Sequence, residues 1–196
     1  MGARPAKLLA PTYAALLSDL RGGRVSVMLH ALRLLALIVA AGLSTVMPSA
    51  PVSAGQPVAF SGQGSAGSIV VRTGERRLYF VTGQGRAIRY TVGVGRADKQ
   101  WFGTTMVASK HIRPAWSPPA EIRRGRANYV IPSGSSRNPM GAAALVLADN
   151  ELAIHGTNNP GSVGGFVSWG CIRMHNKDVI DLYDRVSVGT RVVFTR

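Results

Sequence analysis

A cysteine and a histidine share one glycine-rich stretch in the last quarter of the chain. Cys171 is the only cysteine among 196 residues, and His155 lies sixteen positions before it. A thiol becomes a strong nucleophile when a neighbouring cation or base lowers its pKa from about 8.5, and an imidazole can do this. His155 ends a predicted strand, so it meets Cys171 if the intervening chain folds back. We therefore predict that Cys171 is a nucleophile with a lowered pKa and that His155 is its base.

The residues directly before Cys171 form a predicted oxyanion loop, Trp169-Gly170. Glycine lets the backbone turn sharply, so that the N–H of Cys171 and its neighbours can face an oxyanion. The structural alternative is a buried cysteine that only packs and a glycine-rich segment that only turns. Spacing alone supports both interpretations equally.

Length and composition limit the class of protein. The chain is long enough for one sizeable domain, and 46% hydrophobic residues exclude general disorder. A single cysteine excludes an internal disulfide and any zinc or iron–sulfur site that needs two thiolates from one chain. The net charge of +14 favours a polyanionic neighbour: nucleic acid, an anionic bilayer or an acidic wall polymer. Nucleic acid ranks low, because no known nucleic-acid-binding pattern occurs.

The N-terminal part resembles an export signal. Leu34–Leu43 is an uninterrupted apolar or glycine run after several arginines, and small residues follow it. We predict a signal peptide over residues 1–54, with cleavage after Ala54 or, failing that, Ala50. A membrane anchor is the alternative, although a span needs about 20 apolar residues. Residues 1–27 are an over-extended start if translation begins at Met28.

The exported part then carries an unpaired thiol into an oxidising compartment, which favours a chemical role for it. It keeps 18 basic and 8 acidic residues, a net charge of +10. Residues 55–67 are predicted to be a flexible linker, because they are rich in Gly, Ser, Ala and Gln without periodicity. The catalytic domain is expected over residues 68–196.

Short runs of β-branched and aromatic residues predict seven strands and a mostly β domain. The runs are Ser68–Thr73, Arg77–Thr82, Ala87–Val94, Thr104–Ile112, Ala143–Ala148, Glu151–His155 and Thr190–Thr195. Gly74-Glu75 and Asp149-Asn150 are predicted hairpin turns. One helix is predicted from Asn176, its cap, to Gly189, which follows its end. Two long loops, 114–125 and 132–141, are expected to flank a cleft.

The motif residues resemble the L,D-transpeptidase catalytic domain (YkuD-like) in its proteobacterial form. His155-Gly156-Thr157 is followed by Ser168-Trp169-Gly170-Cys171-Ile172-Arg173, which is similar to the signature of that family. Further similarity lies in Asn138-Pro139-Met140-Gly141, in the predicted helix, around Lys110 and Pro114–Pro119, and near the C-terminus.

The resemblance implies a mostly β, sandwich-like fold with one short C-terminal helix, acting on peptidoglycan stem tetrapeptides. Cys171 would attack a stem carbonyl, expel D-Ala and hold a thioester, while His155 carries the proton. The carbonyl of Gly156 would orient the imidazole. No metal or other cofactor is implied.

Other motif residues have less certain roles. Ser168, Asn158 and Arg173 are candidates for substrate binding, and Arg173 holds its loop through backbone carbonyls in the alternative interpretation. Many family members have His where this chain has Trp169, so a relay role for that residue does not carry over. Trp169 either packs beside the thiol and narrows the cleft or is a core aromatic.

The resemblance leaves the acceptor open. The alternatives are a second stem peptide, a lipoprotein lysine, a free D-amino acid and water. Water as acceptor would make the protein an L,D-carboxypeptidase. A non-catalytic peptidoglycan-binding module and a papain-like hydrolase are rivals. The intact Cys and His disfavour the module, and the order of His before Cys disfavours the hydrolase. A periplasmic, cell-envelope location and a role in cell wall organisation and cell shape are expected.

Overall fold

The computed structural model of the protein describes residues 54–148 and 152–196. The predicted signal peptide, apart from Ala54, and the predicted turn at Asp149-Asn150 lie outside the described residues.

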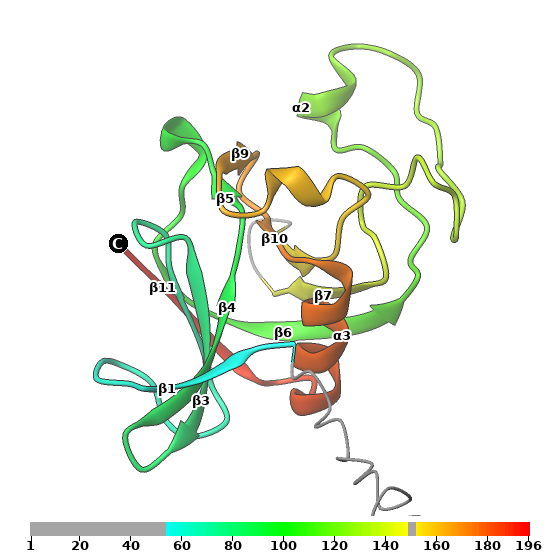
Figure 1. Ribbon diagram of the computed structural model, residues 1–196. Coiled ribbons are helices and arrows are strands. Elements are labelled where there is room, and N and C mark those ends of the chain that lie inside the picture. Colours follow the sequence, from blue (N-terminus) through cyan, green and yellow to red (C-terminus); the bar gives the residue numbers. More distant parts are fainter. Residues whose placement is uncertain (1–53, 149–151) are drawn as a thin grey trace, which may run out of the picture. The chain divides into compact units, whose positions relative to one another are not determined.

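Strands dominate the described part of the chain (Figure 1). They are β1 (Gln56–Ala59), β2 (Ile69–Arg72), β3 (Arg77–Gly83), β4 (Arg86–Thr91), β5 (Val94–Gly95), β6 (Gly103–Ile112), β7 (Ala143–Leu147), β8 (Ala153–His155), β9 (Phe166–Ser168), β10 (Ile172–Arg173) and β11 (Arg191–Thr195). One sheet has the order β1-β4-β3-β2-β11-β6-β7-β8-β10, and β5 pairs with β9. The helical segments are η1 (Ala97–Lys99), α2 (Ala120–Arg123), η2 (Pro160–Ser162) and α3 (Asn176–Arg185).

The long strand β6 joins two parts of the sheet. Its first half pairs with β11 and its second half with β7, and the register shifts between Val107 and Ser109. Such a bulge bends a strand and increases its twist, so the strands on either side of β6 face different directions. The mostly β fold with a helix near the C-terminus is therefore confirmed. The short helix α2 was not predicted.

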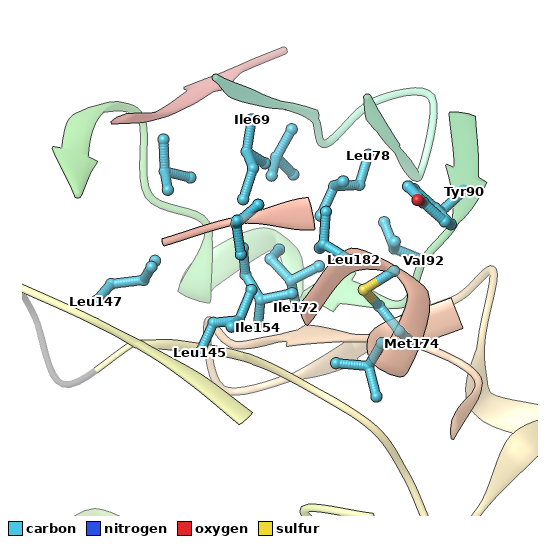
Figure 2. Close-up of a cluster of buried hydrophobic side chains, with 14 of the residues drawn as sticks. Ile69, Leu78, Tyr90, Val92, Leu145, Leu147, Ile154, Ile172, Met174 and Leu182 are labelled. Carbon is cyan, nitrogen blue, oxygen red and sulfur yellow. The ribbon is translucent and has the colours of Figure 1, made fainter. Parts of the chain in front are cut away.

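The core lies between the two parts of the sheet and α3. Ile69 and Leu78 come from β2 and β3, Ile154 and Ile172 from β8 and β10, and Leu182 from α3, and each is at most 1% exposed. Figure 2 shows these side chains gathered in one cluster. Since residues in a strand alternate between its two faces, the opposite face of β8 and β10 is left for residues that line a site.

The helix α3 begins as predicted, but its capping differs. Asn176 is the first helical residue and His175 precedes it as the N-cap residue, without a side-chain hydrogen bond. The Asn176 side chain instead accepts from the N–H groups of Ala142 and Thr157, both at 3.0 Å. Asn176 therefore fastens the helix to the strand ends that carry the site.

Two polar contacts hold α3 against the sheet. The buried Tyr90 of β4 donates to Asp181 at 2.5 Å. Lys110 of β6 donates to the carbonyls of Tyr183 and Val186, at 2.7 and 2.5 Å, where the helix ends. A cation is favourable there, because the last carbonyls of a helix have no partner within it.

The predicted flexible linker over residues 55–67 is corrected by the structure. Gln56–Ala59 forms β1, the edge strand antiparallel to β4, and Gly55 is buried. An added Cβ at Gly55 would lie 2.3 Å from Ile88, so glycine composition here reflects close packing rather than flexibility. The sheet therefore begins about a dozen residues before the predicted domain boundary.

Candidate active site

Strands β8 and β10 run parallel and bring the motif residues together. Ile172 pairs with Ile154 and Arg173 with His155. Paired residues in neighbouring strands point to the same face, and Cys171 precedes Arg173 by two, so His155, Arg173 and Cys171 share one face. All three line one cleft of about 160 Å³, which we call the Cys171 cleft.

His155 is held in one tautomer by its neighbour. Its Nδ1 lies 2.6 Å from the carbonyl oxygen of Gly156. A carbonyl only accepts, so Nδ1 carries the proton and Nε2 keeps its lone pair. Burial, reinforced by the positive charge of Arg173, lowers the pKa of His155 to about 4. The imidazole is therefore neutral at neutral pH, with its Nε2 lone pair unprotonated.

The pKa of Cys171 differs from the prediction. Burial raises the pKa of the thiol, against the backbone N–H of Ala153 and the positive charge of Arg173, which lower it. The predicted lowering is thus wrong in direction, because desolvation disfavours a thiolate more than one guanidinium favours it. At neutral pH the pair is a thiol beside a neutral imidazole, the arrangement that general-base activation requires.

The loop before Cys171 is closed by Ser168. The Ser168 hydroxyl donates to the carbonyl of Cys171 at 2.6 Å and accepts from the N–H of Gly170 at 3.1 Å. Gly170 has φ +125°, and an added Cβ would lie 2.8 Å from Leu152. The Ser168 hydroxyl therefore holds the loop together and engages the N–H of Gly170, while Ser168 also lines the Cys171 cleft.

The two long loops flank the cleft as predicted. Trp116 and Pro119 come from the first loop, and Pro139 and Met140 from the second. Asn138 ties the loops together, since its amide donates to the carbonyls of Pro114 and Pro132 at 2.8 and 3.2 Å. The cleft thus has one wall of β8 and β10 and one wall of loop residues.

Trp169 narrows the cleft and is not a core residue. It is half-buried, lines the cleft with Cys171, and lies under the guanidinium of Arg96 at 4.1 Å from the ring centroid. Lys99 of η1 also approaches its ring, at 5.2 Å, and forms an ion pair with Glu121 of α2. These cations hold an aromatic ring beside the thiol. The sequence analysis missed Arg96, Lys99 and Glu121, because only the fold brings them to the motif.

Arg173 lines the cleft and is also held by the loop after β8. Its Nη1 donates to the Ser162 hydroxyl at 3.0 Å, and its backbone pairs with Gly93. Its Nε is buried and has no partner among the described residues. The loop contact is therefore to a hydroxyl, not to the backbone carbonyls expected.

Asn158 lies apart from the Cys171 cleft. Its amide donates to the carbonyl of Ser136 at 3.1 Å, and it lines a neighbouring cavity. His111 is exposed, and its Nε2 lies 2.9 Å from the Ser109 hydroxyl.

Neither a metal-binding cluster nor a membrane-crossing helix occurs among the described residues. No group of three or more His, Cys, Asp or Glu there could hold a metal ion. Within the same residues, none of the helices has the length and apolar character that crossing a membrane requires.

Similar proteins carry the same domain. The family model described as the L,D-transpeptidase catalytic domain (YkuD) matches residues 66–194. "Probable L,D-transpeptidase YbiS" of Escherichia coli K12 is 38% identical over 140 residues, 64% of this chain and 44% of that protein. "Probable L,D-transpeptidase ErfK/SrfK" of the same strain is 37% identical over 135 residues, 63% of this chain and 42% of that protein. The chain thus matches less than half the length of these curated relatives.

Solved structures share the fold. L,D-transpeptidase 3 from Mycobacterium tuberculosis superposes with a TM-score of 0.53 at 16% identity, over 67% of this chain and 61% of that one. The catalytic domain of the Enterococcus faecium L,D-transpeptidase, solved as acylated by ertapenem, gives 0.53 at 16% identity, over 68% of this chain and all of that one. The strand order around the Cys171 cleft and the matched residues lead to one conclusion. This chain belongs to the L,D-transpeptidase catalytic-domain (YkuD) family.

Proposed function

We propose that the protein is an exported cysteine L,D-transpeptidase that acts on peptidoglycan stem tetrapeptides. The observation that carries the proposal is the shared cleft: Cys171 and His155 line it together, with the imidazole fixed by Gly156. The YkuD family model matches residues 66–194, which include this cleft and its supporting strands.

The proposed acylation uses the protonation states that burial favours. The sulfur of Cys171 forms a bond to the carbonyl carbon of the third stem residue, and Nε2 of His155 takes the thiol proton. The carbon–nitrogen bond to the terminal D-Ala then breaks, and His155 returns the proton to the leaving amine. We expect the N–H of Cys171 and its neighbours to face the developing oxyanion.

An acceptor amine resolves the thioester. The amine attacks the thioester carbonyl, His155 takes its proton, and Cys171 leaves as a thiol. A second stem peptide, giving a 3-3 crosslink, or a lipoprotein lysine supplies this amine. Arg173 lines the cleft with Cys171 and His155, which supports a role in holding a stem carboxylate beside the reacting carbonyl.

Export to the periplasm is part of the proposal. The apolar run Leu34–Leu43 and the small residues before Gly55 support a signal peptide with cleavage after Ala54. Strand β1 begins at Gln56, so this cleavage leaves every strand of the sheet intact.

Mass spectrometry tests the reaction. The purified protein is incubated with disaccharide tetrapeptide, with and without a second amine. We expect a thioester adduct on Cys171, release of D-Ala and a transfer product only when the amine is present. A carbapenem, the class that acylates the Enterococcus relative, should add one equivalent of mass.

Two variants make the test decisive. Cys171→Ala should give neither adduct nor D-Ala. His155→Ala should lose turnover by roughly 10²–10⁴-fold, the usual contribution of general acid–base catalysis. Release of D-Ala by Cys171→Ala at the wild-type rate would overturn the proposal.

A further inference from the structure

A second, larger cavity lies behind the wall of the Cys171 cleft. Its volume is about 610 Å³, and Arg113, Ser136, Thr157 and Asn158 are among its lining residues. The described residues that line it include one charged side chain, Arg113, and no carboxylate or aromatic ring. We call it the Arg113 cavity.

One short segment separates the two hollows. Within Asn138–Gly141, the middle residues Pro139 and Met140 line the Cys171 cleft, whereas Asn138 and Gly141 line the Arg113 cavity. On the strand side, His155 faces the cleft and Thr157, two residues later, faces the cavity. A substrate peptide that leaves the Cys171 cleft over Asn138–Gly141 therefore reaches the Arg113 cavity within a few residues.

Arg113 is fixed by its backbone, while its side chain is uncommitted. Its N–H donates to the carbonyl of Ala142 at 2.9 Å, and its carbonyl accepts from Ser133. Its φ is +46°, a conformation that glycine adopts with less strain, so the turn alone does not explain an arginine. Within residues 54–148 and 152–196, no carboxylate forms an ion pair with its guanidinium.

The other polar groups of the cavity suit a peptide. Asn158 donates through its amide nitrogen to Ser136, and within the described chain its oxygen accepts nothing, so the oxygen is left for a peptide N–H. The Ser136 hydroxyl is likewise without a hydrogen bond to any described group. An arginine fork matches a carboxylate, and these two groups match backbone amides.

We propose that the Arg113 cavity binds a carboxylate-bearing peptide segment of the substrate, with Arg113 on the carboxylate and Asn158 on a peptide N–H. The inference rests on the proposed function and adds a binding site outside the catalytic cleft to it. The segment belongs either to the donor stem that extends beyond the cleft or to the acceptor stem, and both share this chemistry.

Arg113→Gly is the sharpest test, because it removes the guanidinium and relieves the positive φ at the same time. Arg124→Gly is its matched control: Arg124 also has positive φ (49°), is exposed on the same loop and lines neither hollow. Both variants lose one positive charge. We expect Arg113→Gly to raise KM for the stem peptide about tenfold, with kcat within twofold of Arg124→Gly.

Steady-state kinetics distinguish the two possible sources of the bound peptide segment. A raised KM for the donor tetrapeptide alone identifies the donor stem, and a raised KM for the acceptor peptide alone identifies the acceptor stem. Equal KM values in the two variants for both substrates would overturn the inference. Acylation by a carbapenem, which is too small to span both hollows, should be the same in both variants.

A binding measurement keeps this inference separate from the proposed reaction. Titration calorimetry on Cys171→Ala protein compares the stem tetrapeptide with an analogue whose carboxylates are amidated. Amidation should weaken binding about tenfold in the Arg124→Gly background and little in the Arg113→Gly background. If amidation weakens binding equally in both, Arg113 does not hold the carboxylate, whatever the outcome for D-Ala release. Absence of D-Ala release by wild type, with the Arg113-dependent difference present, would instead overturn the proposed function alone.

Discussion

His155 is neutral in the folded protein at neutral pH, because burial lowers its pKa to about 4 from an ordinary 6.5. As the pH falls from 6.5 to 4, the unfolded chain binds a proton at this residue before the folded protein does. The free energy of unfolding therefore falls between pH 6.5 and pH 4. Each pH unit costs about 1.4 kcal/mol, so the total loss is roughly 3 kcal/mol. Urea unfolding of wild type and His155→Gln at pH 7, 5.5 and 4.5 measures it. The variant should lose less stability on acidification, and parallel losses would contradict the assigned pKa.

Gly141 sits where the chain has no room for a side chain. Its φ is +65°, and an added Cβ would lie 2.2 Å from Oδ1 of Asn176 and 2.3 Å from the N–H nitrogen of Thr157. Gly125 has φ +79° with nothing within 4 Å, so Gly125→Ala carries the backbone strain without the clash. We expect Gly141→Ala to lower the free energy of unfolding by about 3 kcal/mol and Gly125→Ala by about 1 kcal/mol. If urea titrations gave the two variants equal losses in the free energy of unfolding, the structure around Gly141 would accommodate the added methyl group without cost.

The same residue scale explains what sequence reasoning achieved at the site. Cys171 and His155 were predicted from their residue types and their place in a short motif, and the role of Gly156 from the family resemblance; the structure places the Gly156 carbonyl 2.6 Å from Nδ1 of His155. The direction of the Cys171 pKa was missed, since burial depends on side chains from distant loops. Ser168 and Asn158 were predicted to bind substrate. The fold engages the Ser168 hydroxyl within its own loop at the Cys171 cleft and places Asn158 in the Arg113 cavity, and a short motif shows neither arrangement.

At the scale of elements, α3 depends on a lysine from another element. Lys110 of β6 reaches two carbonyls at the helix C-terminus, while Lys177 is exposed in the first turn, where a cation is unfavourable. Lys110→Met should therefore destabilise the protein by about 1.5–3 kcal/mol, the range for charge-assisted hydrogen bonds. Lys177→Met, the same change at the other end of the helix, should be neutral or slightly stabilising. Thermal or urea unfolding compares the two, and similar losses would argue against the cap.

Elements were predictable where they are long enough to show a period. Seven runs and one helix were found, since β-branched residues and an apolar stripe repeat along them. Strands β5, β9 and β10 have only two or three residues, too few for any period. Strand β1 contains Pro57 and small polar neighbours, which are typical of a loop, yet it is an edge strand, where proline is tolerated. Strands β1, β5, β9 and β10 form because they pair with strands that lie far away in the sequence, and local sequence does not reveal such partners.

At the scale of the whole molecule, the segment 55–196 carries a charge with a measurable consequence. Its 18 basic and 8 acidic residues leave a net charge of +10, and the segment 113–137 alone holds five arginines and one acid. Attraction between exposed charges is screened beyond about 8–10 Å near physiological ionic strength and beyond about 3 Å at 1 M salt. We therefore expect retention on purified, anionic cell-wall sacculi to fall steeply as NaCl rises from 50 mM to 1 M.

Chemistry in the half-buried Cys171 cleft should respond to salt much less than this retention, because buried charges are screened less. Retention of the Cys171→Ala protein on sacculi and D-Ala release by wild type from soluble tetrapeptide are measured over the same salt series. Using the variant for retention removes any covalent contribution. Retention that survives 1 M NaCl would show that recognition rests on the Cys171 cleft and the Arg113 cavity, whose geometry is specific, and not on the diffuse positive charge of the surface.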